Sequence, residues 1–143
     1  MSDRRRQELR VPELAEPISH YTDAVRFGDL LLVSGCAPLD ATGALVGAGD
    51  VVAQARQVLT NLGLVLRAAG ASSSDVLKVT VYMLDISART EVDKVRKAFF
   101  GTTRPASTLI EVSRLAIPGM LIEIDAIAGF PPDPRRAIRR PQG

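Results

Sequence analysis

The sequence contains no tryptophan, only one cysteine and only one histidine in 143 residues. The single cysteine, Cys36, excludes an internal disulfide and a cysteine-ligated metal cluster, and it is typical of a protein from a reducing compartment. The single histidine, His20, excludes metal sites built from several histidines. A metal site is therefore not expected.

Aromatic residues make up only 4% of the chain, so base stacking has few candidates. The net charge is only +2, and the middle of the chain carries no pattern typical of an RNA- or DNA-binding motif. Seven arginines form clusters at the two ends: Arg4, Arg5, Arg6, Arg135, Arg136, Arg139 and Arg140. Such clusters are typical of solvated tails, so nucleic acid is not an expected partner.

Long hydrophobic runs are also missing. No apolar run reaches the ~18 residues of a membrane span, and no apolar segment typical of a secretory signal follows the arginine-rich N-terminus. We therefore expect a cytoplasmic protein without a membrane segment. The length fits one domain, and the 46% apolar content predicts a packed core.

The order of patterned segments predicts the architecture. We expect an N-terminal arm at 1–17, one domain at 18–128 and a Pro- and Arg-rich tail at 129–143. Within the domain we expect a strand or tight strand pair at 24–35, a short strand at 45–46, a helix at 51–69, a strand at 76–84, a helix at 87–100 and two strands between 107 and 128. This β-β-α-β-α-β-β order predicts an α+β domain of two layers.

The last strand raises the functional question, because it places carboxylates in an apolar run. Side chains alternate between the two faces of a strand, so Glu123 and Asp125 share a face with Leu121 and Ile127. Two helices can cover only one face of such a sheet. The other face, expected to carry Leu109, Leu121 and Ile127, would expose an apolar patch. We therefore predict a homo-oligomer with sites in clefts between subunits.

Several stretches resemble the Rid family, the reactive intermediate deaminases once named YjgF. They read "VSGCAPLD", "QARQVLTNLGLVLRAAGASSSDVLKVTVYMLD", "PASTLIEVSRL" and "IEIDAIA". The resemblance covers roughly 18–128. It implies a chorismate-mutase-like fold and a homotrimer with three inter-subunit clefts. It also implies hydrolysis of small enamines and imines, such as 2-aminoacrylate, to keto acids and ammonia without metal or cofactor.

The resemblance assigns roles to individual residues. Glu123 corresponds to the cleft glutamate that positions water, and Tyr21 to the cleft tyrosine. Ser34 and Gly35 correspond to the serine-glycine pair after the first strand, and Cys36 to the position that follows it. The sequence thus predicts Glu123 and Tyr21 as catalytic residues and the other three as substrate-binding residues.

The chain departs from the family at the position of the arginine that grips the substrate carboxylate. Active members have proline-alanine-arginine-serine, whereas residues 105–108 read proline-alanine-serine-threonine. Ser107, with Leu109 beside it, is therefore predicted to contact substrate in place of the arginine. A serine hydroxyl offers one neutral donor where a guanidinium binds bidentately, a loss on the order of 1.5–3 kcal/mol. We expect poor turnover of 2-imino acids by the family's usual route.

Other interpretations of the same residues stay open. Glu123 and Tyr21 could be structural interface residues, and Cys36 could be a small buried hydrophobe rather than a nucleophile. The leading hypothesis is an arginine-free C–N hydrolase or deaminase that acts on a small-molecule enamine or imine. The alternative is a non-catalytic trimer that binds a small metabolite or has a regulatory role. Ribonuclease activity has been assigned to relatives of this family, but this chain lacks the paired histidines that such activity usually uses.

Overall fold

The computed structural model describes residues 5–130, and the predicted C-terminal tail lies almost wholly outside this range. Six strands and two α-helices follow one another in the order β1 (Arg6–Leu9), β2 (Ala24–Phe27), β3 (Leu30–Cys36), α1 (Val51–Ala68), β4 (Val76–Met83), α2 (Arg89–Phe100), β5 (Ala106–Glu111) and β6 (Ile122–Gly129). Short 3₁₀ turns precede β4 and α2. This arrangement confirms the predicted α+β class.

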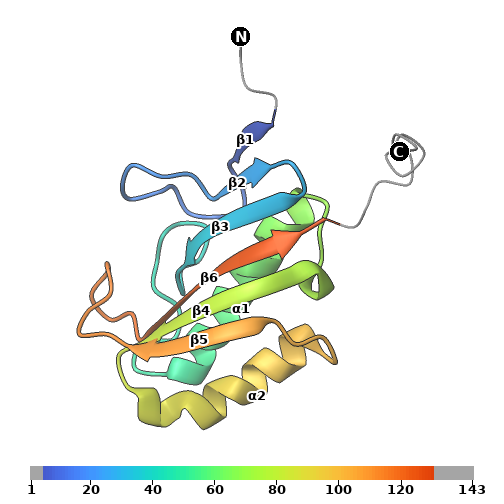
Figure 1. Cartoon of the computed structure of the whole chain (residues 1–143). Helices are drawn as coiled ribbons and strands as arrows, with labels where there is room; N and C mark the ends of the chain where they lie inside the picture. Colours follow the sequence, from blue (N-terminus) through green and yellow to red (C-terminus); the bar gives the residue numbers. More distant parts are fainter. Residues whose placement is uncertain (1–4, 131–143) are drawn as a thin grey trace, which may run out of the picture.

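The six strands form one sheet in the order β1-β2-β3-β6-β4-β5, with α1 behind it and α2 below β5 in the view of Figure 1. All neighbouring strands are antiparallel except β4 and β5, which are parallel and are connected through α2. The last strand, β6, therefore lies in the middle of the sheet between β3 and β4. This central position fixes the backbone of β6 on both sides.

The helix α1 supplies most of the helical side of the core. Asp50 caps it, because its carboxylate accepts hydrogen bonds from the backbone N–H groups of Val52 and Ala53. Leu59, Leu62 and other apolar residues of α1 are fully buried against the sheet. The helix ends at Ala68, close to the predicted end.

Side chains of β6 alternate as predicted. Ile122 and Ile124 are fully buried under the helices, whereas Glu123 and Asp125 are half-buried on the other side. The helices thus cover one face of the sheet and leave the second, which we call the open face.

The open face carries exposed apolar side chains. Phe27, Leu30, Leu32 and Ile110 are each between 38% and 46% exposed. Their strand registers and alternation place them on the side away from the helices. Such a patch is typical of an interaction surface.

Leu109 does not lie on the open face, contrary to expectation. It pairs in register with Val81, which is fully buried beneath the helices, and it packs against the same core cluster. Neighbours in register on adjacent strands point to the same side of a sheet, so Leu109 faces α2.

Two other local features differ from the prediction. Residues 6–9 of the expected arm form β1, an edge strand paired with β2. The expected strand at 45–46 is reduced to a single bridge between Leu39 and Leu45. Among the described residues, no helix is long and apolar enough to cross a membrane.

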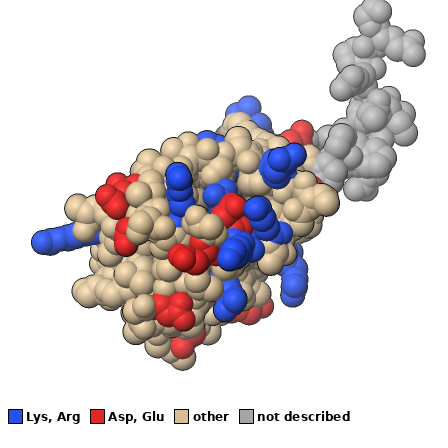
Figure 2. Space-filling view, turned by 90° about the horizontal axis from the view of Figure 1, so that it is seen from below, with Lys and Arg blue, Asp and Glu red and all other residues tan. Residues whose placement is uncertain are grey.

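The surface seen from below the view of Figure 1, where α2 lies, carries charges of both signs. Figure 2 shows acidic and basic side chains intermingled there, without a continuous basic surface. This face therefore does not present the single-sign field that favours a polyanion.

Candidate functional site

A cavity of about 350 Å³ lies beside the start of β6, at the lower end of the size range of small-molecule sites. Four parts of the chain enclose it: the segment before β2, the end of β3, helix α1 and the loop before β6. Its lining is mostly apolar and comprises Leu14, Ala15, Glu16, Ile18, Ser19, Tyr21, Asp23, Ser34, Gly35, Cys36, Ala37, Leu39, Asn61, Val65, Ala116, Ile117, Met120 and Glu123. We call this cavity the β6 pocket.

The Glu123 carboxylate reaches the β6 pocket by passing directly over Gly35. A methyl group on Gly35 would overlap this carboxylate and lie 2.7 Å from its carbon. The register between β3 and β6 also shifts between Val33 and Cys36, so Gly35 lies within a β-bulge. Bulges and strand glycines commonly mark places where a side chain or ligand approaches the backbone closely.

Glu123 has no hydrogen-bond partner and no ion pair within residues 5–130. Burial raises the pKa of Glu123 above its ordinary value of 4.5, and the negative charge of Asp125 raises it further. Asp125 itself accepts a hydrogen bond of 2.8 Å from the Tyr82 hydroxyl. Glu123 is thus a carboxylate whose oxygens remain available to a water molecule or ligand.

Cys36 lies in the wall of the same pocket but is a poor nucleophile. Its side chain is only 6% exposed. Burial, together with the nearby charges of Glu123, Asp23 and Asp125, raises the pKa of the Cys36 thiol to about 12. The thiol therefore stays protonated at neutral pH, which favours the small-hydrophobe interpretation.

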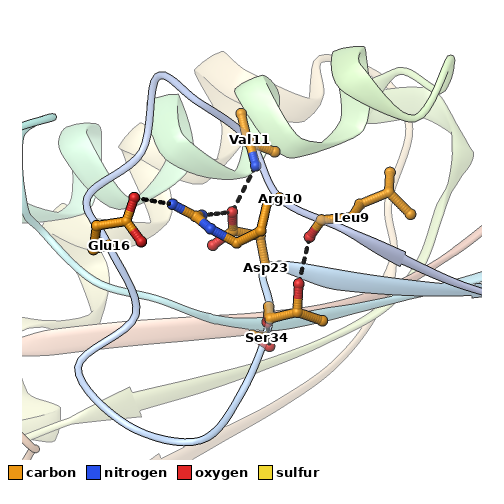
Figure 3. A network of polar contacts seen from close by, with 7 residues as sticks. Leu9, Arg10, Val11, Glu16, Asp23 and Ser34 are labelled. Atoms are coloured by element: carbon orange, nitrogen blue, oxygen red, sulfur yellow. Dashed lines mark hydrogen bonds and ion pairs between the residues drawn. The ribbon is translucent and has the colours of Figure 1, made fainter.

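A polar network fastens the segment that forms one wall of the β6 pocket (Figure 3). The Asp23 carboxylate accepts hydrogen bonds from the Arg10 guanidinium and, at 2.7 Å, from the backbone N–H of Val11. Arg10 also pairs with Glu16 at 3.3 Å. The contact between Arg10 and Asp23 joins the two ends of segment 10–23, and the contact between Arg10 and Glu16 joins one end to its middle. The segment is therefore held as a closed loop.

The same network continues into β3. The Ser34 hydroxyl donates to the backbone carbonyl of Thr22 at 2.6 Å, and the Thr22 hydroxyl donates to the carbonyl of Leu9 at 2.7 Å. Ser34 thus fixes the strand end next to Gly35. Its proton is used in this contact, which leaves its oxygen as an acceptor.

Two buried amides of α1 hold the remaining walls. Gln54 donates to the carbonyl of Gly119 at 2.9 Å and accepts from the N–H of Leu121 at 2.7 Å, which fixes the loop before β6. Asn61 donates to the carbonyls of Ala37 and Leu39, both at 2.9 Å. Helix α1 therefore positions the loops on two sides of the pocket.

The structure brings together five of the seven predicted site residues. Tyr21, Ser34, Gly35, Cys36 and Glu123 all line the β6 pocket. Tyr21 is 47% exposed at the rim, and its hydroxyl makes no hydrogen bond to the described residues.

Ser107 and Leu109 lie outside the β6 pocket, on β5. The Ser107 hydroxyl accepts a hydrogen bond of 2.8 Å from the Arg96 guanidinium, which comes from α2. Burial lowers the pKa of Arg96 from its ordinary value, although the group stays a cation. Within one chain, these residues do not meet Glu123.

Sequence reasoning missed Asp23, Gln54 and Asn61 as organisers of the site. The two amides carried a usable signal, because they are polar residues on the apolar stripe of a predicted helix. Asp23 carried none, because its partners are distant in sequence. Among the described residues, no three side chains of the metal-binding types form a cluster.

Comparison with known proteins gives consistent results. Residues 13–130 match the family described as Endoribonuclease L-PSP. A RutC family protein of Pyrococcus horikoshii is 42% identical over 113 residues, which cover 79% of this chain and 89% of that protein. A 2-iminobutanoate/2-iminopropanoate deaminase of Salmonella typhimurium is 40% identical over 115 residues, covering 78% and 88%.

A solved structure shows the same fold. The chain is 33% identical to YyfA, a protein of unknown function of the conserved Rid protein family from Yersinia pestis. The two structures superimpose with a TM-score of 0.82, over 87% of this chain and 98% of that one.

Proposed function

Because the chain belongs to the Endoribonuclease L-PSP family, to which the Rid and RutC proteins belong, we propose that it hydrolyses small imines and enamines in the β6 pocket. The observation that carries this proposal is the carboxylate of Glu123, which has no partner in the described part of the chain and lies over Gly35 in a largely apolar cavity. The deaminase name of the Salmonella relative supports the same reaction class.

The proposed reaction adds water to a carbon–nitrogen double bond. The substrate reacts as the iminium, with its nitrogen protonated. Glu123 accepts a proton from water as the water oxygen bonds to the iminium carbon, and the electrons of the carbon–nitrogen double bond move to nitrogen, which gives a neutral carbinolamine. Glu123 then gives this proton to the nitrogen. The carbon–nitrogen bond breaks, ammonia leaves with the bonding electrons, and the hydroxyl gives its proton to the Glu123 carboxylate, which passes it to bulk water, as the carbonyl group forms. An enamine first takes a proton on carbon, which gives the same iminium.

The environment of Glu123 suits both proton transfers. A base works best when its pKa approaches the working pH, and burial moves Glu123 in that direction. Tyr21 at the pocket rim would donate its hydroxyl to the substrate or to the developing oxygen. Gly35 and Cys36 would shape the wall against which the substrate lies.

A trapping assay tests this proposal. Imines are generated in place by an amine oxidase or an amino acid oxidase, and semicarbazide competes for them. The protein is expected to lower semicarbazone formation for at least one imine. Ser107→Arg tests the role of position 107. If this variant hydrolyses 2-imino acids and the native protein does not, the cleft is intact but acts on other substrates.

The alternative, a non-catalytic trimer that binds a metabolite, is favoured by one observation, the serine at position 107. It predicts ligand binding in the β6 pocket with no acceleration for any imine tested. Acceleration by the native chain rejects it.

A further inference from the structure

The β6 pocket combines an apolar lining with charge of one sign. Glu16, Asp23 and Glu123 line it, and no lysine or arginine of the described residues does so. Arg10 is close by, but it is engaged by Asp23 and Glu16. The Arg10 guanidinium is therefore paired within the wall, and the Glu123 carboxylate has no counterion among residues 5–130.

An anionic ligand would meet two costs in this pocket. It would lose its hydration in an apolar cavity, and it would lie near an unpaired carboxylate. A ligand that is neutral or positively charged avoids both. An iminium cation would in addition be attracted to Glu123.

The apolar part of the lining indicates the rest of the ligand. Leu14, Ile18, Leu39 and Ile117 present branched aliphatic side chains from three sides of the cavity. These surfaces fit a short branched hydrocarbon, which gains affinity by leaving water.

From this combination we infer that the β6 pocket selects an aliphatic imine without a carboxylate group, such as the imine of an alkyl primary amine. This inference rests on the proposed function for its reaction, but its ligand preference stands on the pocket alone. The product of such a substrate is an aldehyde or ketone, with ammonia. The enzyme class that supplies the substrate would be an amine-oxidising one.

A matched pair of substrates tests this inference. The imine of isopentylamine and the imine of leucine differ only by the carboxylate. We expect kcat/KM to be roughly ten- to hundredfold higher for the isopentylamine imine, because a carboxylate buried without a hydrogen-bond partner has a desolvation cost of about this size. Equal or higher kcat/KM for the leucine imine overturns the inference.

Ile117→Arg places a cation in the loop before β6, which lines the β6 pocket. It is expected to reduce or reverse the preference for the isopentylamine imine over the leucine imine. Ile86→Arg makes the same change on an exposed residue outside the pocket and should leave the preference unchanged. A preference for the leucine imine that disappears in Arg96→Gln would also overturn the inference, and would show that a second copy brings its own cation.

Binding separates this inference from the proposed function. If neither imine is hydrolysed, the proposed function fails, and the ligand preference is measured by NMR titration with isopentylamine, methyl isobutyl ketone and the keto acid of leucine. Tighter binding of the amine or the ketone, with shifts at pocket residues, supports the inference. Tighter binding of the keto acid overturns it.

Discussion

Gly35 and Glu123 form a matched pair, in which the absent side chain of the first makes room for the carboxylate of the second. Gly35 has no positive φ, so its backbone does not require glycine. The requirement comes from the close approach of Glu123 across the bulge between β3 and β6. This relationship links the sheet geometry to the proposed chemistry.

Gly35→Ala should therefore inactivate the protein without unfolding it. The added methyl group meets the far end of a flexible side chain, so Glu123 moves rather than the strand. We expect loss of imine hydrolysis with a cooperative melting transition retained.

Gly63→Ala is the matched control, because a methyl group there would lie 3.4 Å from Phe99, an ordinary contact. It should keep activity, and stability should rise by about 0.5–1 kcal/mol because alanine favours helix α1. Full activity in Gly35→Ala would contradict the account.

The pH dependence of activity should report Glu123. The base must be ionised, so kcat/KM should fall as the pH falls through a pKa that lies above 4.5. Asp125→Asn removes a negative charge that raises the pKa of Glu123, so the acidic limb of the profile should move to lower pH. Asp93→Asn removes an exposed charge that pairs with Lys97 and acts on Arg96 but not on Glu123, so it should leave the limb in place. An unmoved limb in Asp125→Asn would contradict this assignment.

Gln54→Met should loosen the loop before β6. The substitution keeps the size of this fully buried side chain but removes its hydrogen bonds to the carbonyl of Gly119 and the N–H of Leu121. We expect a loss of about 2–4 kcal/mol in the free energy of unfolding, measured by urea denaturation.

Gln57→Met is the comparison, since Gln57 is only half-buried and its contacts lie at the edge of the same helix. A loss below about 1 kcal/mol is expected there. Equal losses in the two variants would show that Gln54 has no special role.

The open face should bring copies of the chain together. Its exposed apolar side chains and the resemblance to the Rid family predict a homotrimer, and sedimentation of the purified protein measures this directly. Leu32→Glu should shift the protein toward monomers of 15.3 kDa. Ile86→Glu, outside the sheet, should not. A native protein that sediments as a monomer at micromolar concentration would contradict the prediction.

The sequence predicted the features that depend on local periodicity. The alternation of side chains predicted that Glu123 and Asp125 lie on the face that the helices do not cover. The spacing of apolar residues predicted which face of α1 is buried. The family resemblance, made on motifs around Cys36 and Glu123, is confirmed by the comparisons. These signals are local or lie in contiguous motifs, so they can be recognised in the sequence without a structure.

What the sequence did not predict depends on contacts between distant segments. The strand β1 is short and mostly exposed, and it exists because it pairs with β2. The Arg10–Asp23 contact and the place of Leu109 under α2 follow from strand register. The need for glycine at position 35 is visible only once Glu123 lies above it.

The most direct test of the account is the rate of imine hydrolysis by Glu123→Gln beside the native protein, with Glu111→Gln as the control. Glu111 lies on β5 outside the β6 pocket, and its side chain accepts from the backbone N–H of Ile86. We predict that Glu123→Gln lowers kcat/KM by roughly 10²- to 10⁴-fold, whereas Glu111→Gln retains it. Native-like hydrolysis by Glu123→Gln would contradict the central claim that this carboxylate activates the water.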